Sequence, residues 1–340
     1  MKANGFGTQF DRLFVAVLTP MKENYEIDEP ALRKFLQYFM QPTFREAGGA
    51  IIINPEAGEL FCMSREEKRR NVEIALEECG GKVPVFAGVI DVSTADAVKV
   101  AKDVKEVGAD GLFLMPPIGS IDVSTSWNAE KYPEVFIDMA KAEVEAAGDM
   151  PAIVHPVCTA SAAWGIGFPL TTTLQTCQEI PNIVGWKMTY SYPGGFVIAK
   201  ALRKLDRHVA ILRSNGKYMH ENILTGYFDG TVSGSFNYAM ESMIDHINAL
   251  KRGDVKEALR IWKSGLEDLH EYIYADYSRI HVRYKLATWM RGLIPLPFMR
   301  PPVPKPRKEE ALTLRELVTK AGFSTVPDSD FNRILGQLRL

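Results

Sequence analysis

The sequence has few of the features that mark secreted, disulfide-stabilised or membrane proteins. Its four cysteines show neither C-x-x-C spacing nor the density of a secreted disulfide scaffold. No segment holds eighteen consecutive apolar residues, and residues 1–14 lack the long apolar core of a signal peptide. We therefore expect a reduced, cytoplasmic protein without a membrane partner.

Strong charge and metal-binding motifs are also missing. The chain has 40 basic and 42 acidic side chains, a net charge of −2, and no basic run that would attract nucleic acid. Its six histidines are scattered and form neither H-x-x-x-H nor H-E-x-x-H, so we expect no metal site. The 340 residues, 46% apolar and 24% charged, are typical of a soluble globular protein with a large core.

What the chain does contain is a repeated unit, a short apolar run followed by an amphipathic helical stretch. Apolar runs without polar alternation are typical of strands covered on both faces of a parallel sheet. Ser64 and Glu67 have capping-box spacing at the start of one helical stretch, and Gly108 is placed to end the next. The eight predicted strands are residues 13–19, 49–54, 83–89, 110–116, 151–156, 182–188, 209–214 and 230–235.

Eight such units predict an α/β fold, a (β/α)₈ TIM barrel, over residues 1–252. A doubly wound sheet would need a glycine-rich turn after the first strand, and residues 19–28, TPMKENYEID, contain no glycine. Residues 253–340 are predicted to form a helical extension packed on the barrel. Within it we expect two helices, a rigid proline-rich connector rather than a peptide ligand, and a last helix.

Active sites of such barrels lie at the carboxyl ends of the strands, which directs attention to Lys187. This lysine ends the apolar run of IPNIVGWKMTY, beside a tryptophan. Burial lowers the pKa of an amine, and a neutral amine can attack a carbonyl to form a Schiff base. The alternative is a lysine paired with a buried carboxylate or reaching out to solvent, and the residues alone leave both possibilities open.

Six segments carry a resemblance to a known family: AVLTP, AGELFCMSREEKRRNVEIA, VPVFAGV, EVGADGLFLMPP, IPNIVGWKMTY and RYKLATWMRGLIPLPFMRPPVPKP. Through them the chain resembles, over most of its length, the dihydrodipicolinate synthase/N-acetylneuraminate lyase family of class I, Schiff-base-forming aldolases and hydro-lyases. The resemblance implies a TIM barrel, Lys187 as the Schiff-base lysine, no metal or organic cofactor, and assembly as a homo-oligomer, a dimer or a tetramer.

The loop after the second strand departs from the family pattern. In the family this loop reads Gly-Thr/Ser-Thr/Ser-Gly-Glu and holds the carboxylate of a 2-oxo acid. Here both hydroxyl residues are missing and Glu56 takes one of their places, so it would repel that carboxylate unless it were protonated or turned away. The alternative is that Glu56 caps the next helix or pairs with a basic neighbour. By resemblance, the substrate-binding residues of this loop are Glu56, Ala57, Gly58 and Glu59.

The fifth strand also departs from the pattern. The family's Tyr-Asn-x-Pro, with its proton-shuttling tyrosine, is replaced by a motif that begins with His155. A histidine titrates near neutrality and can act as general acid and base, although a merely hydrogen-bonded histidine at a strand end is the alternative. The arginine that dihydrodipicolinate synthases use for their second substrate aligns with Ala160, and the family's tyrosines align with Pro117 and Ile118. Lysine biosynthesis is therefore not expected.

Other candidates lie at the ends of the remaining strands. Arg213 could clamp a substrate carboxylate or form a salt bridge at the rim. By resemblance, Val232 and Ser233 of the eighth strand belong to the substrate pocket. Aromatic side chains that could face the substrate, or simply pack, are Tyr190, Tyr192, Trp127 and Trp164.

Together these features predict a class I lyase that acts on a 2-oxo acid. An aldolase that releases or condenses pyruvate is favoured, including the hydratase–aldolase type. A sugar-acid dehydratase or aldolase of the same family is the alternative. A third possibility is a catalytically impaired barrel that only binds a ligand. In that case no group able to move a proton would lie within hydrogen-bond reach of Lys187.

Overall fold

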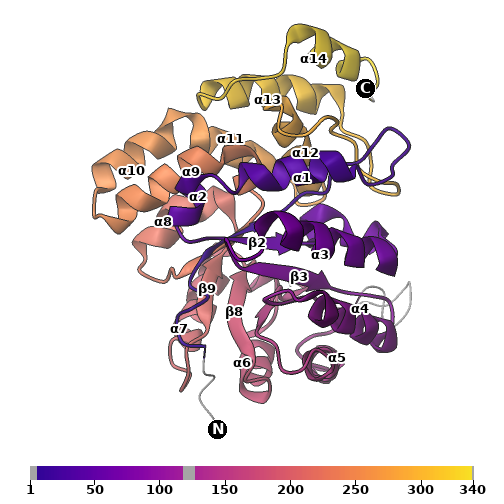
Figure 1. The fold of residues 1–340 in the computed structure, drawn as a ribbon. Helices are drawn as coiled ribbons and strands as arrows, with labels where there is room; N and C mark the ends of the chain where they lie inside the picture. Colours follow the sequence, from indigo (N-terminus) through magenta and orange to yellow (C-terminus); the bar gives the residue numbers. More distant parts are fainter. Residues whose placement is uncertain (1–5, 118–126, 339–340) are drawn as a thin grey trace.

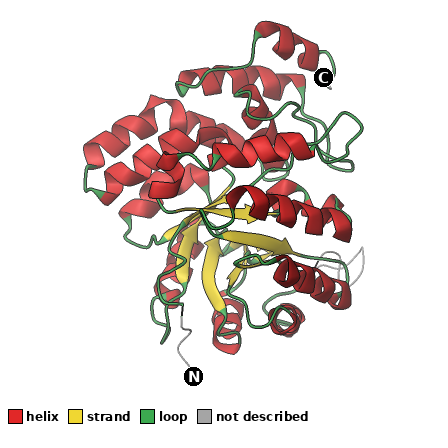
Figure 2. Cartoon of the chain, in the orientation of Figure 1, coloured by secondary structure: helices red, strands yellow, loops and turns green. Residues whose placement is uncertain are grey.

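The structure, a computed structural model, describes residues 6–117 and 127–338 and contains a closed barrel of eight parallel strands (Figures 1 and 2). Going around the barrel, the order is β1-β10-β9-β8-β5-β4-β3-β2. Barrel strands that follow one another along the chain are therefore neighbours in the barrel, and β1 pairs with β10 to close it. This confirms the predicted TIM barrel. The barrel strands are β1 (Leu13–Ala16), β2 (Gly49–Ile53), β3 (Val85–Val89), β4 (Gly111–Leu114), β5 (Ala152–Val154), β8 (Ile183–Met188), β9 (Ala210–Arg213) and β10 (Gly230–Ser233).

Helices surround the strands, as Figure 2 shows in red around yellow. Local signals set their ends: Ser64 and Glu67 form the reciprocal capping box, and Gly108 adopts φ +95° where its helix ends. The helices are α1 (Glu29–Tyr38), α2 (Pro42–Glu46), α3 (Arg65–Cys79), α4 (Thr94–Val107), α5 (Glu134–Ala146), α6 (Leu170–Glu179), α7 (Tyr192–Leu202), α8 (Met219–Leu224) and α9 (Phe236–Lys251).

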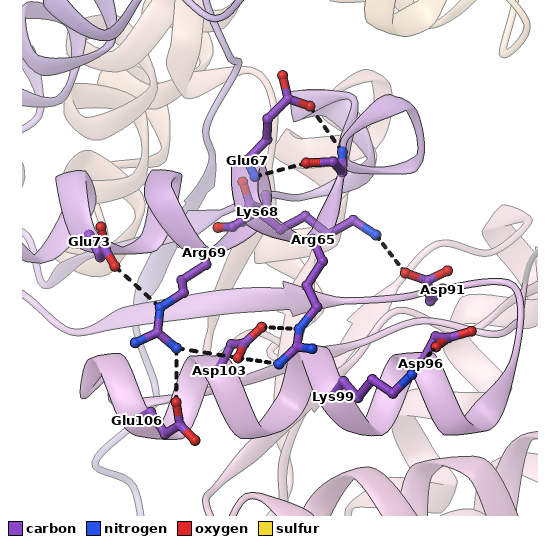
Figure 3. A network of polar contacts seen from close by, with 12 residues as sticks. Arg65, Glu67, Lys68, Arg69, Glu73, Asp91, Asp96, Lys99, Asp103 and Glu106 are labelled. Carbon is purple, nitrogen blue, oxygen red and sulfur yellow. Dashed lines mark hydrogen bonds and ion pairs between the residues drawn. The ribbon is translucent and has the colours of Figure 1, made fainter.

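Ion pairs join α3 and α4 on the outer surface (Figure 3). Arg65 Nε lies 2.5 Å from Asp103 Oδ2, and Arg69 Nη1 lies 2.9 Å from Glu106 Oε2. Such partly exposed pairs contribute only about 0–1 kcal/mol each, so they orient the helices more than they stabilise them.

The barrel interior is a packed apolar core rather than a pore. Phe86 contacts the rings of Phe10 and Phe14 edge-on, with centroid separations of 5.1 and 5.2 Å. Leu212 and Val232 belong to the same interior cluster. Polar side chains can therefore gather only above this core, at the strand ends.

The carboxyl-terminal part is helical and lies at one end of the molecule, with α13 and α14 at the top of the view (Figure 1). The first of the two predicted helices is divided by a π-helical turn (Trp262–Leu266), in which Gly265 has φ +106°. One helix, α14, was not predicted. The helices are α10 (Val255–Ile261), α11 (Glu267–Tyr274), α12 (Ile280–Met290), α13 (Lys308–Lys320) and α14 (Asp328–Leu335).

A short hairpin follows β5 and was not predicted from the sequence. It is formed by β6 (Val157–Ser161) and β7 (Gly165–Gly167). In the proline-rich connector, Phe298 and Met299 are buried, as predicted for a segment that packs down. Helix α12 contacts α9 of the barrel. The division at residue 252 stays a prediction. No helix within residues 6–117 and 127–338 is both long enough and apolar enough to cross a membrane.

Candidate active site

A cavity of about 140 Å³ lies at the carboxyl ends of the barrel strands. Its size is close to that of an engineered cavity of about 150 Å³ that holds benzene, so it suits a molecule of about six non-hydrogen atoms. The lining residues come from the strand ends, the loop after β2 and the carboxyl-terminal helices. They are Ala16, Pro55, Glu56, Ala57, His155, Ile166, Lys187, Thr189, Ser214, Asn215, Val232, Gly234, Tyr274, Tyr277, Ile280, His281 and Tyr284.

A register shift in β8 directs Lys187 into this cavity. Ile183 and Gly185 pair with consecutive residues of β5, so β8 contains one extra residue at this point. Ile183 and Trp186 both pack toward the helices, although regular alternation would place them on opposite faces. The extra residue thus reverses the inward and outward alternation of the side chains that follow it in β8. As a result Lys187 faces the cavity and not the side of the strand on which Ile183 lies.

Gly185 is required at this shift, which gives a first prediction. A Cβ atom there would lie 2.7 Å from Leu212 Cδ1 and 3.2 Å from Ile153 Cγ1. We expect Gly185→Ala to destabilise the protein by about 1–3 kcal/mol through overpacking, measured by urea unfolding. Gly336→Ala is the matched control, because the atom nearest to its Cβ, the carbonyl oxygen of Arg333, would be 3.5 Å away and its φ is −63°. Equal unfolding midpoints for the two variants would contradict the argument.

The amine of Lys187 is enclosed and lies beside an imidazole. Its Nζ is 3.1 Å from His155 Nε2 and 5.8 Å from the centroid of the Phe113 ring. Burial lowers the pKa of Lys187 to about 8, a shift that the carboxylate of Glu56 partly opposes. About a tenth of the amine is then neutral at pH 7, compared with less than a thousandth for an ordinary lysine.

His155 is buried at the end of β5, where its ring stacks on Phe113 at 5.7 Å. Burial, then the charge of Lys187, and then His281 hold the pKa of His155 well below its ordinary value. The ring is therefore neutral near pH 7 and can accept a proton. Nδ1 lies 3.6 Å from Glu56 Oε2 and 3.5 Å from Lys187 Nζ, so the ring lies beside both a carboxylate and the amine.

Residues of the carboxyl-terminal part line one side of the cavity, which was not predicted from the sequence. His281 of α12 lines the cavity, and burial, opposed by the charge of Glu56, lowers its pKa. Tyr274, Tyr277 and Tyr284 line the same wall. Tyr274 ends α11, Tyr277 lies in the turn that follows, and His281 and Tyr284 lie three residues apart on one face of α12.

Two predicted residues at the strand ends are placed away from the cavity. Arg213 is buried, and its Nε donates to the carbonyl of Tyr227 at 2.9 Å. Its neighbour Leu212 occupies the barrel interior, so alternation points Arg213 outward, and the geometry does not support the expected carboxylate clamp. Val232 lines the cavity, whereas Ser233 lies behind it, where its Oγ accepts from the backbone N–H of Ser235 at 3.1 Å.

The loop after β2 divides between the cavity and the core. Glu56 and Ala57 line the cavity, and the Glu56 side chain is 39% exposed. Gly58 packs so closely that a Cβ would lie 2.7 Å from the carbonyl oxygen of Val17. Glu59 is fully buried in an ion pair with Lys285, at 2.5 Å, so it serves the structure and not the expected substrate contact.

The candidate aromatic residues do not line the cavity. Trp127 and Trp164 border a separate hollow that also includes Ala160. The hydroxyl of Tyr190 is buried and accepts from Trp186 Nε1 at 2.9 Å. Tyr192 is partly exposed and packs against Phe196 and Tyr218. Of the residues aligned with the family's tyrosines, Pro117 follows β4, and Ile118 lies outside the described residues.

Comparisons with known proteins agree with the motifs. The model of the dihydrodipicolinate synthetase family matches residues 9–321. A 4-hydroxy-tetrahydrodipicolinate synthase of Methanopyrus kandleri is 27% identical over 319 residues, which are 93% of this chain and 98% of that protein. An uncharacterized DapA-like lyase of Thermofilum pendens is 26% identical over 310 residues, 90% of this chain and 95% of that protein.

A comparison with solved structures finds proteins of the same family. The crystal structure of dihydrodipicolinate synthase from Aquifex aeolicus aligns with a TM-score of 0.76 and 25% identity, covering 94% of this chain and 100% of that one. The sequence match spans nearly the whole chain, and the barrel carries a lysine at the end of its sixth strand. The chain therefore belongs to the dihydrodipicolinate synthetase family, whose members are lyases.

Proposed function

We propose that this chain is a class I lyase in which Lys187 forms a Schiff base with a small carbonyl compound, 2-oxo acids being the class that the family motifs imply. The observation that carries the proposal is the contact between an enclosed amine of lowered pKa and a neutral imidazole, 3.1 Å apart. Both groups lie in a cavity of a size suited to such a compound.

The chemistry follows from this geometry. The neutral amine of Lys187 attacks the carbonyl carbon, and the carbonyl oxygen leaves as water after taking two protons, with His155 placed to relay them. The resulting imine, once protonated, withdraws electrons from the bond between its α and β carbons. When His155 removes a proton from a hydroxyl on the β carbon, that bond breaks. The β carbon leaves as a new carbonyl, and the electron pair remains between the imine carbon and the α carbon as an enamine.

An aldolase is the favoured reaction type, and a sugar-acid dehydratase or aldolase is the alternative. Both pass through the same imine and need the same proton relay. A ligand-binding barrel without turnover would lack a proton-moving group near the amine, and the position of His155 counts against it.

Borohydride trapping tests the proposal. The protein is incubated with pyruvate, longer 2-oxo acids and uncharged ketones, reduced, and examined by peptide mass spectrometry. We expect a stable adduct on Lys187 with at least one of these compounds. If none of them labels this lysine, the Schiff-base assignment fails.

His155→Gln tests the proton relay. We expect kcat to fall about 10²–10⁴-fold on the compound that trapping identifies, because a positioned acid–base group contributes about that much, while an adduct on Lys187 still forms, only more slowly. His208→Gln is the control, because that ring pairs with Asp11 and does not line the cavity. An unchanged kcat in His155→Gln would remove the histidine from the mechanism.

A further inference from the structure

The cavity has an unusual set of charges for a site that would bind an anionic substrate. Among its described lining residues Lys187 is the sole lysine or arginine, and Glu56 is an acid. The two histidines, His155 and His281, have lowered pKa values and are neutral. The undescribed segment 118–126 contains neither lysine nor arginine. Hence no cation besides the nucleophile itself is in place to bind a substrate carboxylate.

The position of Glu56 makes a bound carboxylate unfavourable. Both charges lie beside the ring of His155: Glu56 Oε2 is 3.6 Å from Nδ1, and Lys187 Nζ is 3.5 Å from the same atom. The carboxylate and the amine are therefore no more than about 7 Å apart, and a carboxylate on the carbon next to the imine would share the cavity with Glu56. For two charges about 7 Å apart at an effective dielectric constant of about 20, the repulsion would weaken binding about 50-fold.

The same carboxylate favours the intermediate that Lys187 would form. A protonated imine is a fixed cation, and the Glu56 carboxylate already raises the pKa of the amine that it faces. With a 2-oxo acid, the substrate would bring its own anion to this position. Here the protein supplies the anion.

Neutral hydrogen-bonding groups line much of the remaining surface. Thr189 Oγ1 and Ser214 Oγ lie 3.3 Å apart, and Asn215 Nδ2 donates to the Tyr277 hydroxyl at 3.1 Å. All four residues border the cavity. Such groups recognise hydroxyls by paired donors and acceptors without favouring a charge.

We propose, building on the Schiff-base function above, that the substrate is a small uncharged hydroxy ketone or hydroxy aldehyde whose carbonyl carbon bears no carboxylate, with Glu56 as the counter-ion of its imine. This differs from the class that the family motifs imply, because the substrate would be a carbonyl compound without the carboxylate of a 2-oxo acid.

Hydroxyacetone and pyruvate form a matched pair of probes, since a hydroxymethyl group in one replaces the carboxylate of the other. Each is trapped with borohydride over a range of concentrations, in the native protein and in Glu56→Gln. The readout is the concentration that half-labels Lys187. We expect the preference for hydroxyacetone over pyruvate to be at least about tenfold greater in the native protein than in Glu56→Gln. Comparing two proteins cancels the intrinsic reactivities of the two ketones.

Glu130→Gln is the control for loss of a carboxylate, because Glu130 borders the separate hollow. It should keep the native preference. The inference would be overturned if the native protein and Glu56→Gln showed the same preference. It would also be overturned if pyruvate labelled the native protein as readily as hydroxyacetone does. Both outcomes leave the Schiff-base function intact. Labelling by neither compound in either protein, with none by the wider panel, would overturn both proposals.

Discussion

Replacing Lys187 by methionine is expected to abolish both borohydride trapping and turnover, because it is the sole lysine among the described residues that line the cavity. Methionine keeps the volume of the side chain and removes an amine that has no carboxylate at ion-pair distance among the described residues. The variant should therefore melt at or above the native temperature. Lys204→Met, at an exposed lysine, should trap normally. An adduct of native yield in Lys187→Met would mean that another lysine carries the chemistry.

The native protein should show the matching pH dependence. Since burial lowers the pKa of Lys187 to about 8, the neutral fraction rises about tenfold per pH unit below that value and levels off above it. The initial trapping rate should follow the same curve. A rate that kept rising up to pH 10 would indicate a fully hydrated lysine.

Breaking the ion pair between Glu59 and Lys285 is expected to cause the largest loss of stability. Both side chains are fully buried, and Glu59 also accepts from the backbone N–H of Arg300 at 2.6 Å. Removing one partner leaves the other charge buried and uncompensated, which costs about 3–5 kcal/mol. For a chain of this size we expect Lys285→Met to lower Tm by about 5 °C, measured by calorimetry.

The double variant Glu59→Gln/Lys285→Met provides the internal control. It removes both charges, so its loss should be smaller than the sum of the two single losses. Lys22→Met, in an exposed pair with Glu26, should change Tm very little. Single variants that melt like the native protein would show that the buried pair contributes nothing.

The sequence was sufficient to predict the barrel because the determinants of its strands are local. Most predicted strands are nearly continuous apolar runs, and all eight appear in the structure within a few residues of the predicted bounds. The end of the sixth strand was predicted for the same reason. The hairpin of β6 and β7 was missed because its sequence, VCTASAAWGIG, has no regular alternation, and half of it is solvent-exposed.

Side-chain direction was less predictable, because it depends on distant partners and on register. Glu59 resembles a substrate-binding residue until Lys285, 226 positions later, is seen to neutralise it. Arg213 is the last residue of β9, in which Leu212 faces the barrel interior, so the Arg213 side chain faces outward. Lys187 faces inward only because β8 gains a residue against β5. His281 could not be assigned to the cavity without knowing where α12 packs.

During synthesis the eight strands leave the ribosome well before α12, since β10 ends at Ser233 and α12 begins at Ile280. Without α12, water could reach the amine of Lys187 from the side that His281 and Tyr284 cover in the folded chain. A hydrated amine stays protonated and unreactive near neutral pH. The reactivity of the barrel's nucleophile therefore depends on a helix that is synthesised after the barrel itself.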